Sequence, residues 1–211
     1  MKLAIFGGTF DPIHQAHLAI AREAGERCGL DRVLLVPAAH PPHKTGVTHT
    51  PYEHRVRMAE LACRGQGRLE VSRLEENTER SYSIDTIEKV RARMAPEDEL
   101  SFVIGADAFA DIRTWRRWRD VAQEVCFIVV SRPGISYEVP PGVSLRRLDR
   151  LELPISSSEI RRVLAAGGRP PEIPPQADLV FVIDLYLPAE VIIQNGSRPT
   201  NPSAGGGMRR R

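Results

Sequence analysis

The chain has 211 residues, of which 42% are hydrophobic and 27% are charged, and its formal net charge is +2. This length allows one substantial core, and the small charge argues against a dedicated nucleic-acid binder, which usually has a strong basic excess. The longest late apolar run, residues 179–183, is far shorter than the ~20 residues of a membrane span.

Apolar runs alternate with helical patterns along the chain. Buried strands are predicted at residues 3–6, 33–36, 101–104 and 125–130, and shorter ones at 69–71 and 144–148. Helices are predicted after Pro12, over residues 52–63, from Ser83 as N-cap to Met94, around 115–122 and over 156–166. This alternation predicts an α/β fold, a Rossmann-like doubly wound parallel sheet with helices on both faces.

No repeat or linker divides residues 1–195, which we expect to form a single domain. From Gly196 onward, glycine, serine, proline and arginine dominate, and this composition predicts a disordered tail over residues 196–211. Cys28, Cys63 and Cys126 are widely spaced among apolar neighbours. They predict free buried thiols in a reducing compartment, and residues 1–6 are too short for a signal peptide. We therefore expect a cytoplasmic protein.

In a sheet of this kind, ligands bind beyond the carboxyl ends of strands, where the strand order reverses. The loop after the first strand begins with Gly7 and Gly8, which allow backbone N–H groups to approach an anion closely. The loop has neither the Gly-Lys-Ser/Thr of a Walker loop nor the third glycine of the dinucleotide fingerprint. His14 and His17 follow at a helix start, on one face near the positive end of the helix dipole. Imidazoles at this place can donate hydrogen bonds to phosphate oxygens.

Two later segments offer further groups for an anion. Prolines stiffen the loop over residues 40–44, and Lys44 can place a point charge on a polyphosphate. Ser156 and Glu159 fit a capping box, so a helix begins there, and its N–H groups with Arg161 form a second anion site. Each segment alone also has a plain structural explanation, as a helix cap, a solvated lysine or a surface arginine.

Taken together, these segments resemble two nucleotidyltransferase signatures. Residues 7–17 resemble a Gly-rich turn followed by His-x-Gly-His, and residues 155–161 resemble Ile-Ser-Ser-Thr-x-Ile-Arg. More narrowly, the chain resembles the bacterial nicotinate-nucleotide adenylyltransferases over about residues 1–165. The segments that support this are 36–44, 81–86, 103–107, 114–115 and 131–134. Ala16 departs from the family's glycine and Ser158 from its threonine, and the family's closing helix is not evident in residues 176–189.

The resemblance implies adenylyl transfer from ATP to nicotinate mononucleotide, which gives deamido-NAD and pyrophosphate in NAD biosynthesis. The catalytic residues it implies are His14, His17, Lys44 and Arg161. The ATP-binding residues it implies are Gly7, Gly8, Thr9, Phe10, Gly105, Asp107, Arg132, Ser156 and Ser157. The nicotinate nucleotide would meet Ile84, Trp115 and Arg116, with Trp115 stacked on the ring. Mg²⁺ would be carried on ATP without a metal site of the protein. The resemblance implies neither a nucleic acid nor a membrane as partner, and it leaves a homo-oligomer open.

Three alternatives remain open at this point. An adenylyltransferase could use nicotinamide mononucleotide or phosphopantetheine, although the Trp115 segment and residues 81–86 disfavour phosphopantetheine. A non-catalytic nucleotide-sensing protein is disfavoured by the intact His17, Lys44 and Arg161. The arginines around Trp115 and Trp118 could contact nucleic acid, but a solvated helix face explains them as well.

Deleting residues 196–211 is expected to change neither turnover nor melting temperature, because a segment of this composition cannot bury a core. Thermal unfolding and steady-state kinetics of the truncated chain measure both quantities. A clear loss of either would show that the tail docks on the folded part.

Overall fold

The structure is a computed structural model that describes residues 1–41, 50–131, 134–149 and 155–175. Within these residues one sheet has the strand order β3-β2-β1-β4-β5-β6, and every neighbouring pair is parallel. The strands are β1 (Lys2–Gly8), β2 (Arg32–Pro37), β3 (Leu69–Val71), β4 (Glu99–Gly105), β5 (Cys126–Val130) and β6 (Leu145–Leu148). The predicted parallel sheet is confirmed.

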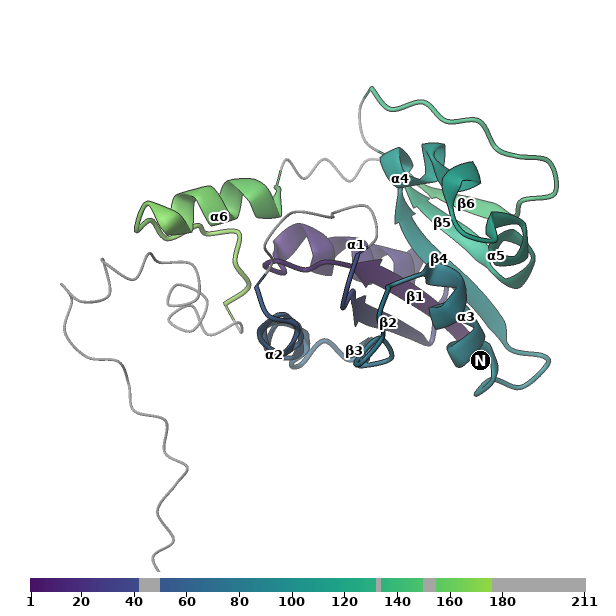
Figure 1. The fold of residues 1–211 in the computed structure, drawn as a ribbon, viewed down its shortest axis with the longest axis horizontal. Helices are drawn as coiled ribbons and strands as arrows, with labels where there is room; N and C mark the ends of the chain where they lie inside the picture. The colour runs from purple at the N-terminus through teal and green to yellow at the C-terminus, as the bar shows by residue number, and fades with distance from the viewer. Residues whose placement is uncertain (42–49, 132–133, 150–154, 176–211) are drawn as a thin grey trace, which may run out of the picture.

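Helices cover both faces of this sheet (Figure 1). They are α1 (Gln15–Arg27), α2 (Tyr52–Cys63), α3 (Ser83–Arg91), α4 (Ala106–Ala110), α5 (Trp118–Glu124) and α6 (Ser157–Ala165), with a 3₁₀ turn η1 (Ile112–Thr114). Successive side chains of a strand point to opposite faces. In β1, Ala4 and Phe6 accordingly join the core under α1 and α2, whereas Leu3 and Ile5 join the core under α3 and α5. The doubly wound architecture follows from this two-sided burial.

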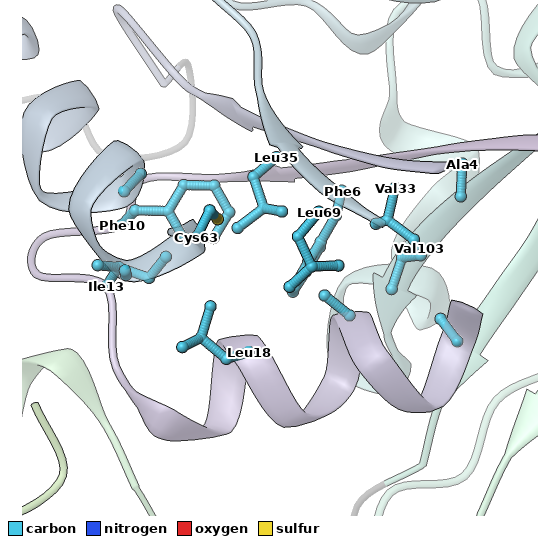
Figure 2. Close-up of a cluster of buried hydrophobic side chains, with 14 of the residues drawn as sticks. Ala4, Phe6, Phe10, Ile13, Leu18, Val33, Leu35, Cys63, Leu69 and Val103 are labelled. Carbon is cyan, nitrogen blue, oxygen red and sulfur yellow. The ribbon is translucent and has the colours of Figure 1, made fainter. Parts of the chain in front are cut away.

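The core on the α1 side also includes side chains from the loop after β1. Figure 2 shows Phe10 and Ile13, both 1% exposed, in one cluster with Leu35 and with Leu18 of α1. Burying each such side chain contributes roughly 1.5–3 kcal/mol. The loop that we expect to bind phosphate is therefore anchored in the core.

The helix predictions are wrong in several details, among them the end of α3, which lies at Arg91 and not at Met94. The N-cap of α3 is Tyr82, not Ser83. The helix predicted around residues 115–122 begins only at Trp118, because Arg117 adopts a left-handed backbone conformation with φ 52°. The short helix α4 was not predicted, since its five residues directly follow β4 and are too few for a periodic pattern.

The chain after α6 returns to the same core. Ile173 is 5% exposed within the α1-side cluster, and the carbonyl of Glu172 accepts a hydrogen bond of 2.8 Å from the N–H of Gln15. The domain thus extends at least to this segment, whereas residues 176–195 and the predicted tail lie outside the described residues. None of the helices in the described ranges is long and apolar enough to cross a membrane.

Candidate active site

The strand order reverses at β1, which pairs with β2 on one side and with β4 on the other. Such a switch point opens a crevice at the carboxyl ends of the strands. A pocket of about 190 Å³ lies there. Its lining comes from the ends of β1, β2 and β4, the start of α3 and residues far apart in sequence, among them Gly7, Ala38, Glu75, Ser83, Thr86, Gly105 and Trp115.

The loop after β1 has no room for a side chain at position 8 unless the Phe10 ring moves. A Cβ atom added at Gly8 would lie 2.9 Å from the ring of Phe10, whereas one added at Gly7 would meet nothing closer than 3.7 Å. Phe10 has a left-handed φ of 48° and stands edge-on to the rings of Phe6 and His17, at 5.6 and 5.0 Å between centroids. Because the side chain of Phe10 is buried in the core, this residue can contact a ligand only through its backbone. The predicted ATP contacts of Gly7, Gly8, Thr9 and Phe10 are therefore backbone contacts, except for the Thr9 hydroxyl.

His14 and His17 stand together at the start of α1. His14 is the N-cap residue, and the two rings stack with their centroids 3.7 Å apart. The backbone N–H of His14 donates to Nδ1 of His17 at 3.2 Å. The proton of a neutral His17 ring then sits on Nε2, which makes that atom a donor. Ala16, between them, is only 4% exposed, so the chain itself covers most of its methyl group.

The start of α6 docks against the same loop from the other end of the sequence. Arg161 donates to the carbonyl of Asp11 and, at 3.3 Å, to the hydroxyl of Ser158. The hydroxyl of Ser157 donates to the carbonyl of Pro12 at 3.1 Å. Ser156 is the N-cap, and its oxygen accepts from the N–H of Glu159 at 3.2 Å. The start of α6 is thus held against the turn that precedes α1, and the N-termini of both helices carry the positive ends of helix dipoles.

The end of β4 lies across the crevice from β1. Gly105 is the N-cap of α4, and Asp107 is an exposed residue of its first turn. The carboxylate of Asp107 folds back so closely that a Cβ atom at Gly105 would lie 2.5 Å from Oδ1. An exposed carboxylate at this edge suits the hydroxyl groups of a ribose.

Of the residues predicted for the mononucleotide, Trp115 lines the pocket, whereas Ile84 and Arg116 are not among its lining residues. Trp115 stands edge-on to Phe102, with 5.8 Å between centroids. Arg116 lies over the ring of Tyr82 at 4.7 Å and pairs with Asp85 at 3.6 Å. The side chain of Arg116 therefore reaches the start of α3, where Ile84 is 1% exposed.

Lys44 and Arg132 lie outside the described residues, so their predicted roles stay predictions. The sequence interpretation missed two buried charged residues, Arg55 and Glu75, which are 1% and 7% exposed. Arg55 shares the buried stripe of α2 with Met58, Ala59 and Ala62. A charged residue on an apolar stripe is a signal that could have identified it. Glu75 has no local pattern that distinguishes it.

Arg55 joins the loop ends near the crevice. Its guanidinium donates to the carbonyls of Thr9, Ala38 and Thr50 at 2.7, 2.7 and 2.8 Å. It also lies 5.7 Å from the centroid of the Tyr52 ring. Burial, with nearby acidic groups, raises the pKa of Tyr52 to about 12, so this hydroxyl is protonated at neutral pH. The described residues contain no group of three or more His, Cys, Asp or Glu side chains that could hold a metal ion.

Fold and site together define a nucleotide-binding α/β protein in which two helix N-termini lie near a pocket lined by Trp115. The model of the cytidylyltransferase-like family matches residues 5–163. A Solibacter usitatus protein named "probable nicotinate-nucleotide adenylyltransferase" is 71% identical over 187 residues, which cover 89% of this chain and 99% of that protein. A Thermus thermophilus protein of the same name is 45% identical and covers 79% of this chain and 88% of its own length.

The solved structures include a nicotinic acid mononucleotide adenylyltransferase of Plasmodium falciparum, with a TM-score of 0.71 and 21% identity. The match covers 88% of this chain and 97% of that one, and at this identity it supports the fold alone. The chain belongs to the cytidylyltransferase-like family and, within it, to the nicotinate-nucleotide adenylyltransferases.

Replacing Gly8 by alanine is expected to destabilise the protein by about 1–3 kcal/mol, because the methyl group would displace the buried Phe10 ring. Urea unfolding measures the difference. Gly7→Ala is the matched control, since its added Cβ meets only ordinary contacts. Equal stability of the two variants would show that the Phe10 ring can move aside at no cost in free energy.

Proposed function

We propose that this chain transfers the adenylyl group of ATP to nicotinate mononucleotide, with deamido-NAD and pyrophosphate as products. The observation that carries the proposal is that two different binding surfaces lie at the two ends of the loop after β1. One is the turn of Asp11 and Pro12, where the start of α6 docks just ahead of α1, and the other is the pocket lined by Gly7 and Trp115. The first suits a triphosphate and the second suits a flat ring.

The comparisons support the same substrates. The name shared by the Solibacter and Thermus relatives states the reaction. The Plasmodium falciparum neighbour is described in complex with NaAD and, separately, with APC. A dinucleotide that spans the crevice between β1 and β4 agrees with the two surfaces described above.

The proposed reaction depends more on alignment of the two reactants than on activation of the nucleophile. The 5′-phosphate of the mononucleotide is anionic at neutral pH, so one of its oxygens can attack the α-phosphorus of ATP without a protein base. A new P–O bond forms to the α-phosphorus as the bond to the pyrophosphate oxygen breaks, and pyrophosphate leaves with the electron pair. The protein contributes by holding the reactants in line and by stabilising charge on the α-phosphate and the leaving group.

The residues at the first loop suit these two tasks. His17 presents a donor at Nε2 because its Nδ1 already accepts the backbone N–H of His14. Ser156 and the start of α6 provide N–H groups on the other side of the turn. We propose that Lys44, Arg132 and Arg161 add positive charge around the triphosphate. Gly105 and Asp107 are proposed to meet the adenosine.

We propose Mg²⁺ as the metal that accompanies ATP. The described donor set fits an ion held by phosphate oxygens and water, because N–H groups and imidazoles surround the turn and no acidic cluster is found among the described residues. Bound in this way, Mg²⁺ neutralises charge on the triphosphate. We also propose the cytoplasm as the place of reaction, since Cys28, Cys63 and Cys126 are free thiols.

Discrimination between the acid and the amide is expected to come from the pocket. At the start of α3, the N–H groups of Ser83 and Ile84 have no hydrogen-bond partner among the described residues, and N–H groups of this kind favour a carboxylate. The Glu75 carboxylate also lines the pocket, but its oxygens accept hydrogen bonds from Thr86 and Ala39. We therefore expect kcat/KM to favour nicotinate mononucleotide over the amide by about a hundredfold, or about 3 kcal/mol.

Pyrophosphate release with ATP and each mononucleotide in turn tests this preference directly. Equal efficiency with the two mononucleotides, or a preference for the amide, would contradict the substrate assignment. Absence of pyrophosphate release with either would contradict the proposed reaction as a whole.

His17→Asn is expected to lower kcat at least about a hundredfold, the scale for losing one preorganised donor in the transition state. The asparagine oxygen can still accept the His14 N–H, so the helix start is retained. His17→Gln is the matched variant, because its longer amide can place a donor near the position of Nε2, and it is expected to lose less activity. A folded His17→Asn variant with near wild-type kcat would refute the role.

Trp115→Ala is expected to raise KM for the mononucleotide about tenfold through lost stacking and to leave KM for ATP nearly unchanged. Trp115→Phe retains an aromatic ring, so its KM for the mononucleotide should lie between those of the wild type and Trp115→Ala. Trp118→Ala is the control, because Trp118 does not line the pocket. Similar KM values in the Trp115→Ala and Trp118→Ala variants would remove Trp115 from the binding site.

A further inference from the structure

Arg55 and Glu75 approach the same backbone segment from opposite sides. Arg55 comes from α2, and its guanidinium donates to the carbonyl of Ala38 at 2.7 Å and to that of Ala39 at 3.5 Å. Glu75 follows β3 in the chain, and its Oε2 accepts the N–H of Ala39 at 3.3 Å. The segment between them leaves β2 and lines the pocket at Ala38.

The Ala38 carbonyl and the Ala39 N–H belong to one peptide group. Asp11–Pro12 is the cis bond that the described residues contain, so this peptide is trans and its oxygen and hydrogen point in opposite directions. A cation therefore sits at the negative end of the peptide dipole and an anion at its positive end. Charges arranged in this way polarise the peptide and strengthen each other's hydrogen bond.

Each charged residue also holds a different half of the site. The guanidinium of Arg55 donates to the carbonyl of Thr9, in the loop that we propose for the phosphates. The Oε1 of Glu75 accepts the hydroxyl of Thr86, on the α3 wall of the pocket. The next residue, His40, is held as well, because its N–H donates to the Ser81 hydroxyl and its carbonyl accepts the Ser81 N–H.

We propose that Arg55 and Glu75 are positioning residues that act through the peptide between Ala38 and Ala39 and couple the ATP half of the site to the mononucleotide half. Neither residue touches reacting atoms in this role. A shift of the peptide moves the Thr9 carbonyl through Arg55 and the Thr86 hydroxyl through Glu75. The coupling rests on the proposed function, because it is observed only in the kinetics of a reaction that uses both ATP and the mononucleotide.

The test is a double-mutant cycle in steady-state kinetics with ATP and nicotinate mononucleotide. The variants are Arg55→Lys, Glu75→Ala and their combination, assayed well below their melting temperatures. Lysine retains the charge, but its ammonium cannot span three carbonyls as the planar guanidinium does. Arg57→Lys and Glu76→Gln are matched controls, because these neighbours form exposed ion pairs with Glu60 and Arg73.

Each single variant is expected to raise KM for both substrates and to lower kcat/KM about tenfold or more, while the controls stay within about twofold of wild type. The double variant should lose about as much as the worse single variant, not the product of the two losses. Glu75→Gln should recover part of the activity, because its amide oxygen still accepts the Ala39 N–H. If Glu75→Ala does not fold, the same cycle is run with Glu75→Gln.

Three results would overturn the coupling, the first two of them kinetic. One is multiplicative losses in the double variant, and the other is an Arg55 variant that changes only ATP kinetics together with a Glu75 variant that changes only mononucleotide kinetics. Lower melting temperatures with unchanged KM values would show a purely structural role. Wild type that releases no pyrophosphate would instead refute the proposed function, so the two failures are distinguishable.

Discussion

The pairing of β1 with β2 on one side and β4 on the other is the constraint on which the candidate site depends. Phe6 is in register with Leu35 of β2 and with Val103 of β4, so Gly8, Ala38 and Gly105 reach the same edge. Right-handed crossovers that leave this edge in opposite directions place α1 and α3 on opposite faces of the sheet. The crevice between them is a product of topology, and its walls come from segments that are distant in sequence.

A buried cation holds the loop ends that this topology brings together. A guanidinium removed from water is tolerated only when its N–H groups are bonded, and the carbonyls of Thr9, Ala38 and Thr50 meet that need. The same bonds satisfy backbone carbonyls that the irregular loops would otherwise leave buried without a hydrogen-bond partner. Loops held in this way keep their N–H groups in one arrangement, which is what electrostatic stabilisation of a phosphoryl transfer requires.

Local patterns predicted much of the framework and part of the site. The helix expected over residues 52–63 matches α2, and the expected strand at 69–71 matches β3. The spacing of His14 and His17 predicted their common place at a helix start. The start of α5 could not be predicted in this way, because the left-handed Arg117 interrupts a segment whose composition is helical. For Arg55, its place on the apolar stripe of α2 indicated that it is buried. The carbonyls to which it donates could not be predicted, because they lie in three other segments.

The sequence by itself determined the strands, most helices, the Gly-rich turn and the family to which the chain belongs. Hydrophobic periodicity, glycines and caps act over a few residues, so they can be recognised in the chain alone. Only the tertiary structure decided that Arg161 meets the carbonyl of Asp11, 150 positions away, and that Glu75 and Trp115 line one pocket. Those contacts depend on the order and register of the strands, which arise from the burial of both sheet faces together and not from any local segment.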